Sequence, residues 1–225
     1  MKLKKIVSLA LAGILAVSML TACGDNSSNN GGASSGDTTP SSSYTETVLK
    51  ATNAATQTKL SASTNDKLDK AVAWAAQMDR SNSIGSSYTS LANITDSNWN
   101  IVKKAQEYMG GSGLQNYGSD QGWDFSAEKA VTWNNNNPSF PITYWTMYCV
   151  SRTASDEYIT NEMAEKLDTW AKTMENKGEE AKGATWDYTV SVSKADCAGE
   201  DLADKSDDYV IIGVAITTNK TTVKY

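Results

Sequence analysis

Residues 209–225, YVIIGVAITTNKTTVKY, contain the stretch that decides the fold. Within residues 209–217 both alternating sets of side chains are mostly apolar. A strand that is apolar on both faces is buried on both sides, so we predict that this strand lies at the centre of a sheet. Asn219 and Lys220 follow it, and we predict a hairpin turn there that leads into a last strand at residues 221–225.

Two further segments predict strands beside this central one. In residues 186–193 (WDYTVSVS), Trp, Tyr and Val alternate with polar side chains, which is typical of a half-buried strand. Residues 142–151 (ITYWTMYCVS) are rich in aromatic and β-branched types, which favour a pleated, packed surface.

Apolar residues at helical spacing occupy much of the remaining chain. The strongest such run is residues 156–177, closed by Gly178, and its apolar members recur three or four positions apart. They are Ile159, Met163, Leu167, Trp170 and Met174. Further helices are predicted at residues 44–58, at 63–80 with Ser63, Thr64 or Asn65 as the N-cap, at 97–109, and from Ser126 to about 134–138. The expected fold class is α+β, with helices ahead of a small, mainly antiparallel sheet.

The first 23 residues carry an export signal. Three lysines in the first five residues precede the apolar run of residues 6–20, which is too short for a comfortable membrane span. The run ends in Leu20-Thr21-Ala22-Cys23, which resembles the lipobox of bacterial lipoproteins. The resemblance implies cleavage before Cys23 and acyl chains, such as palmitate, on this cysteine. An ordinary secretory peptide cleaved near Ala22 is the alternative.

The domain organisation follows from this signal. We predict a signal peptide at residues 1–22, a lipid-anchored flexible Ser/Gly/Asn linker at 23–43, and one extracellular α+β domain at 44–225. Removing residues 1–22 leaves 17 basic and 26 acidic side chains, a net charge of −9. The expected location is the extracytoplasmic face of the bacterial cell membrane, with the membrane as a partner only through the N-terminal lipid.

The whole chain of 225 residues contains no histidine and carries a net charge of −6. The absence of imidazole excludes histidine-dependent catalysis and histidine-ligated metal sites. The acidic balance argues against a nucleic-acid partner. We predict no catalytic residue, no metal site and no cofactor.

Cys149 and Cys197 are the two remaining thiols once Cys23 carries lipid. Outside the membrane they could form a disulfide that closes a loop of about 50 residues. Two separate buried thiols, which behave as small hydrophobes, are the alternative. The sequence is compatible with both the disulfide and the two separate thiols.

Aromatic composition suggests a ligand-binding surface. The chain has 7 Trp and 10 Tyr but only 2 Phe, and several of them lie between residues 123 and 148. Amphipathic rings suit an exposed platform for a glycan or a protein, although they also suit a core. The first candidates for a platform are Trp123, Trp133, Tyr144 and Trp145.

Two other patterns carry less weight. Residues 126–129 and 191–194 match the S-x-x-K motif of penicillin-binding enzymes, but the partner motifs S-D-N and K-T-G do not occur in the chain. Residues 196–208 hold six acidic side chains, which we interpret as a solvated turn rather than a calcium loop.

Residues 48–78 and 207–225 resemble the CAP superfamily of cysteine-rich secretory and pathogenesis-related domains. The residues that fall on the family's pattern are Asn53, Leu60, Leu68, Ala71 and Ala75, followed at the end of the chain by an apolar-Gly-apolar strand. The resemblance implies an α-β-α sandwich. It also implies a cleft with two His and two Glu for a divalent metal, but no His is present, so only the scaffold carries over.

These observations predict a non-catalytic, CAP-like domain for extracellular or cell-envelope binding. The alternative is an envelope glycan hydrolase that uses paired carboxylates and needs no histidine. Two carboxyl groups roughly 5 to 10 Å apart in a cleft would favour the enzyme.

Overall fold

The computed structural model describes residues 38–39, 41–76, 89–94, 105–110, 114–115, 123, 125, 140–175, 184–196 and 209–222. Within these ranges the fold is α+β, as predicted, and its sheet is mainly antiparallel. The three long strands are β5 (Ile142–Ser151), β6 (Ala184–Asp196) and β7 (Tyr209–Thr222).

Strand β7 lies at the centre of the sheet, between β6 and β5, and both pairings are antiparallel. Its residues from Tyr209 to Ile216 are all buried, which confirms the prediction from two apolar faces. Four short strands extend the sheet: β1 (Thr38–Thr39) and β2 (Leu60–Ala62) pair with β6, and β3 (Ala92–Asn93) and β4 (Leu114–Gln115) pair with β5.

The predicted hairpin turn at Asn219 and Lys220 is wrong. Both residues belong to β7, where Asn219 pairs with Asp187 and Lys220 pairs with Trp186. The strand continues because its β-branched threonines favour extended backbone and because β6 is long enough to pair with them. The strand predicted at residues 186–193 is confirmed and is longer at both ends, but it is half-buried only as far as Thr189, because Ser191 and Ser193 on its polar side are each 2% exposed.

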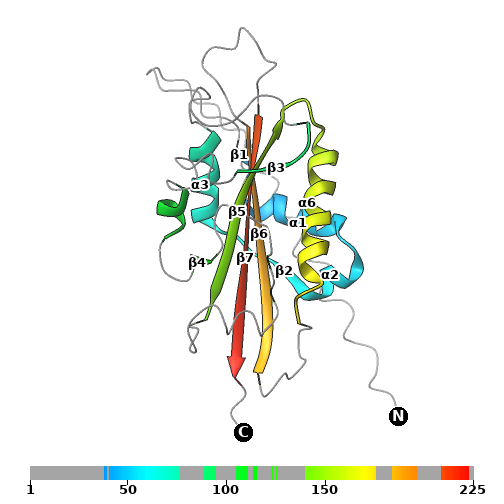
Figure 1. Ribbon diagram of the computed structural model, residues 1–225, viewed down its shortest axis with the longest axis vertical. Coiled ribbons are helices and arrows are strands. Elements are labelled where there is room, and N and C mark those ends of the chain that lie inside the picture. Colours follow the sequence, from blue (N-terminus) through cyan, green and yellow to red (C-terminus); the bar gives the residue numbers. More distant parts are fainter. Residues whose placement is uncertain are drawn as a thin grey trace, which may run out of the picture. The chain divides into compact units, whose positions relative to one another are not determined.

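Helices cover both faces of the sheet (Figure 1). On one face α3 (Asp66–Ala76) packs with the odd-numbered side chains of β7, such as Ile211. On the other face α1 (Ser41–Ala51) and α6 (Asp156–Ala171) pack with the even-numbered ones, such as Ile212. The part of the chain that the structure describes is therefore a helix-sheet-helix sandwich.

The helix predicted at residues 44–58 is two helices. α1 ends at Ala51, and Asn53 is the N-cap of α2 (Ala54–Lys59), where its side chain accepts a hydrogen bond from the Thr56 N–H at 3.0 Å. Asp168 of α6 also accepts from the Asn53 N–H, at 3.2 Å. The Asn53 cap at the start of α2, itself held by Asp168, thus divides the predicted helix.

The other helix predictions hold in part. Asn65 caps α3 by accepting from the Leu68 N–H at 3.1 Å, and the predicted helix at 63–80 is described as far as Ala76. α6 ends at Ala171, six residues before the predicted end, and Lys59 donates to the Ala171 carbonyl there. Residues 105–109 are helical, whereas the helix predicted from Ser126 lies outside the described residues.

The folded part begins earlier than the predicted boundary at residue 44. β1 and the first turn of α1 fall inside residues 23–43, which were expected to be linker. The signal peptide at 1–22 and Cys23 lie outside the described residues. No helix in the described ranges is long and apolar enough to cross a membrane.

Candidate functional site

Three of the four predicted platform residues belong to the core. Trp123, Tyr144 and Trp145 are 5%, 3% and 0% exposed, so the expectation of an exposed platform is corrected for them. Tyr144 and Trp145 are successive residues of β5 and point to opposite faces, each of which is packed. Trp123 packs against Trp170 of α6 with ring centroids 4.6 Å apart and the ring planes tilted by 37°. Trp133 lies outside the described residues.

The predicted cysteine pair stays a prediction. Cys149 is buried on β5 and its thiol lies 3.8 Å from the Ala92 carbonyl oxygen. Cys197 lies outside the described residues, and its neighbour Asp196 ends β6, which β7 separates from β5.

The second S-x-x-K match does not form a catalytic pair. Ser191 exchanges hydrogen bonds with Ser63, whereas Lys194 bonds to Asp156, on the opposite face of β6. Residues 126–129 and the acidic segment after Asp196 lie outside the described residues. No group of three acidic or cysteine side chains that could hold a metal ion is found in the described ranges.

The structure does bring together a polar surface that the sequence did not suggest. We call it the threonine face. It is formed by side chains on the α3 side of the sheet, beyond the end of α3: Thr143, Thr185, Asp187, Thr189, Thr217, Asn219 and Thr221. Asp187 and Thr221 are exposed and the other five are half-buried. All seven therefore reach solvent.

The strand register sets the geometry of the threonine face. Thr217 of β7 pairs with Thr143 of β5 on one side and with Thr189 of β6 on the other, so three hydroxyls form one row across the sheet. The hydroxyl groups of Thr143 and Thr217 are hydrogen-bonded at 2.9 Å. Neighbouring strands lie about 4.8 Å apart, so the three hydroxyls are regularly spaced at a distance comparable to the size of a sugar ring.

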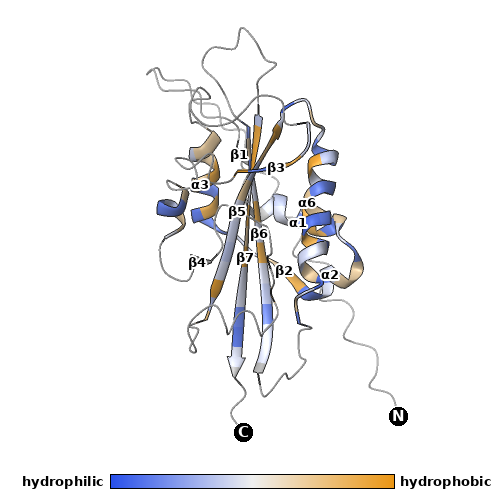
Figure 2. Cartoon of the chain, in the orientation of Figure 1, coloured by the Kyte–Doolittle hydropathy of each residue, from blue (hydrophilic) through white to orange (hydrophobic). Residues whose placement is uncertain are grey.

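The same strands look different where α3 covers them. There Gly213 of β7 lies so close to α3 that an added Cβ would stand 2.9 Å from Leu68 Cδ1 and would also contact Val72. Figure 1 shows α3 beside the upper part of the three strands, which continue well below it. Figure 2 shows the hydrophobic colours of β7 in its upper part and hydrophilic ones in its lower part.

The opposite side of the threonine face is packed. Trp186 is 2% exposed and meets the Phe140 ring edge to face at 5.3 Å, and the Lys220 Nζ lies 5.2 Å from the Trp186 ring. Tyr188 donates from its hydroxyl to the Phe125 carbonyl at 3.0 Å. Because these side chains pack closely on the opposite face, they support the part of the sheet that carries the threonine face.

The chemistry of the threonine face is hydrogen bonding. Hydroxyl and amide groups both donate and accept, as the hydroxyls of a sugar do. Asp187 is the one carboxylate among the seven residues, whereas a glycosidase needs two carboxyl groups across the bond that it cleaves. The surface is thus equipped to bind a polyhydroxylated ligand and holds no acid–base pair of its own.

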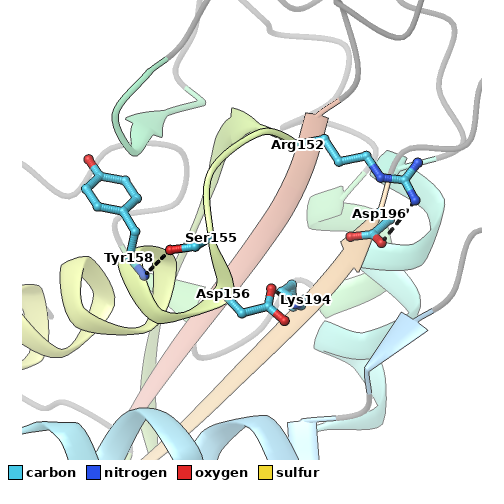
Figure 3. A network of polar contacts seen from close by, with 6 residues as sticks. All are labelled: Arg152, Ser155, Asp156, Tyr158, Lys194 and Asp196. Atoms are coloured by element: carbon cyan, nitrogen blue, oxygen red, sulfur yellow. Dashed lines mark hydrogen bonds and ion pairs between the residues drawn. The ribbon is translucent and has the colours of Figure 1, made fainter.

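A second polar group lies at the other end of the sheet (Figure 3). Lys194 of β6 contacts Asp156, the first residue of α6, at 2.7 Å, and Arg152 contacts Asp196 at 3.7 Å. Lys194 Nζ also lies 5.5 Å from the Tyr44 ring, and burial raises the pKa of the Tyr44 hydroxyl. These contacts fasten α1 and α6 to β6, which is a structural role.

No family model matches the chain, and neither a curated protein nor a solved structure matches it.

The threonine face was missed because the turn predicted at Asn219 and Lys220 divided its central strand. A usable signal was present in residues 217–222 (TTNKTT), because threonine favours strands and neither glycine nor proline interrupts the run. Its position beyond α3 could not be read from the sequence, since that depends on where a helix from another part of the chain ends.

Proposed function

We propose that this protein is a bacterial lipoprotein, held at the extracytoplasmic face of the cell membrane by acyl chains on Cys23, whose domain binds a cell-envelope glycan without catalysing a reaction. The observation that carries the binding proposal is the threonine face, a solvent-reaching array of hydroxyl and amide groups on a supported sheet. The lipobox-like sequence before Cys23 supports the proposed lipid anchor and location.

The CAP-like scaffold belongs to the same proposal. This scaffold is supported by helices on both faces of a mainly antiparallel sheet. It is also supported by the places of Asn53 as the N-cap of α2, Leu60 at the start of β2 and Leu68 within α3. Leu60 and Leu68 are 3% and 0% exposed, so both residues of the resemblance are core residues.

Binding is tested by cosedimentation with insoluble peptidoglycan that carries its attached polysaccharides. The double variant Thr189→Ala/Thr217→Ala is expected to lower the affinity at least about fivefold, because each lost hydrogen bond contributes about 0.5–1.5 kcal/mol. Thr47→Ala/Thr169→Ala is the matched control: it removes the same number of hydroxyls from exposed positions of α1 and α6. Equal binding by both double variants would contradict the proposal.

The membrane location is tested separately by cell fractionation. Replacing Cys23 with Ser is expected to shift the protein out of the membrane fraction, because the sulfur that would carry the lipid is absent. A Cys23→Ser protein that remains in the membrane fraction would exclude the lipid anchor.

The glycan hydrolase remains the competing prediction. It requires soluble reducing ends to accumulate when the protein is incubated with the same peptidoglycan. Their release, and its loss in Asp187→Asn, would turn the threonine face from a binding surface into part of an active site.

A further inference from the structure

Asp187 occupies the middle of the threonine face. It lies opposite Asn219 in the pairing of β6 with β7. The side chains of the same face that surround it in the strand register are all polar: Thr185, Thr189, Thr217, Asn219 and Thr221. Opposed side chains of an antiparallel pair are about 5 Å apart and diagonal ones about 7–8 Å. The carboxylate is therefore surrounded by hydroxyl and amide groups at distances comparable to the size of a sugar ring.

Asp187 carries a charge that the described part of the protein does not neutralise. Its side chain is exposed, and it forms no hydrogen bond or ion pair with another residue that the structure describes. The two lysines that adjoin it in the strand register, Lys59 and Lys220, are engaged on the other side of the sheet. The Lys59 Nζ donates to the Ala171 carbonyl of α6 at 2.8 Å. The Lys220 Nζ lies 5.2 Å from the ring of Trp186, in the packed layer opposite the threonine face.

The charge of Asp187 distinguishes between classes of glycan. A polyanionic polysaccharide would meet a like charge on a protein whose net charge is already −6. A neutral glycan would pair its hydroxyls with the threonines but leave the carboxylate without a counter-charge. An amino sugar that is not N-acetylated carries an ammonium group on the same ring as its hydroxyls, and an ammonium group donates up to three hydrogen bonds. The polar groups around Asp187 match this third class.

We infer that the threonine face recognises a polysaccharide whose amino sugars carry free amino groups, with Asp187 binding the ammonium group and the surrounding threonines binding the adjacent hydroxyls. The inference rests on the glycan binding of the proposed function and names the class of glycan. Asp187 provides the selectivity, because a carboxylate attracts an ammonium group more strongly than a neutral N-acetyl group. An exposed ion pair contributes modestly and is screened by salt, so we expect about threefold tighter binding of the free amine at low ionic strength.

Cosedimentation with beads of cross-linked chitosan tests this class, because chitosan carries amino groups on its sugars and contains no peptide. The same beads after N-acetylation, which leaves the sugar hydroxyls in place, are the matched ligand. The full-length protein in a non-ionic detergent is assayed at low ionic strength and about pH 6, where amino groups are largely protonated. The variants are Asp187→Asn and, as a control for net charge, Glu157→Gln at an exposed position in the first turn of α6.

The expected result is about threefold tighter binding of the wild-type protein and of Glu157→Gln to the free-amine beads than to the acetylated beads. Asp187→Asn is expected to bind both kinds of bead equally. Equal binding of the wild-type protein to the two kinds of bead, or a preference that Asp187→Asn retains, would overturn the inference. Peptidoglycan in the same assay separates this failure from that of the proposed function, because a glycan-binding protein that lacks only the amine preference still sediments with peptidoglycan.

Discussion

Two halves of one sheet face differ in what lies against them. In the half beneath α3, the side chains of the three long strands are those of a core, including Trp145, Met147 and Ile211. In the open half, the same face of the same strands presents Thr143, Thr217 and Asn219. The strands pair through both halves without a break in the backbone hydrogen bonding. The two halves therefore differ only in their side chains, which change from apolar to polar where α3 ends.

The largest difference between the halves is expected at Gly213 and Thr217, which lie four residues apart on the same face of β7. Gly213→Val places methyl groups where Leu68 and Val72 already are, and is expected to lower the free energy of unfolding by about 3 kcal/mol. Thr217→Val adds no atom against a helix and is expected to change it by less than about 0.5 kcal/mol. Urea unfolding of the chain without residues 1–23 measures both, and similar losses would contradict the contrast.

A smaller difference is expected from hydroxyl groups. Thr45→Val leaves the buried N–H and carbonyl of Val192 without their Thr45 partner, at a cost of about 2 kcal/mol. Thr143→Val breaks the hydroxyl pair with Thr217, but there solvent can replace the lost partner, so about 0.5 kcal/mol or less is expected. Urea midpoints that fall equally in the two variants would show that the threonine face is as closed as the core.

The smallest effect concerns pH. Burial raises the pKa of Tyr44, so below pH 10 its contribution to stability is fully present. Above pH 10 the unfolded chain loses this proton before the folded domain does, and stability falls as the pH rises through the folded pKa. Tyr44→Phe is therefore expected to flatten the decline of the urea midpoint between pH 9 and pH 11. An unchanged decline would show that a group other than Tyr44 causes the loss of stability at alkaline pH.

The sequence predicted the covered half better than the open half. In residues 209–216 two apolar faces have one explanation, a strand packed on both sides, and the structure confirms it. In residues 217–222 both faces are polar, so no periodic pattern distinguished a strand from a turn. Residues 217–222 form a strand because Asn219 pairs with Asp187, and this pairing depends on the length of β6.

The aromatic residues show a second limit of the sequence. Amphipathic rings are equally suited to a platform and to a core, and composition alone could not separate these uses for Trp123 and Tyr144. Their burial follows from Phe125, Trp170 and the helices that pack over β5. For Tyr144 and Trp123 alike, contacts with α6, which is distant from Trp123 in the sequence, help to bury the ring.

β7 is one unbroken strand, covered by α3 at one end and with side chains that reach solvent at the other. Amide hydrogen exchange along β7 tests this most directly. The account predicts slow exchange for residues 210–218 and for the alternate amides of residues 219–222 that face β6, even though the side chains of Asn219 and Thr221 reach solvent. Rapid exchange of all amides from Asn219 onward would show a turn there and would remove the outer half of the threonine face.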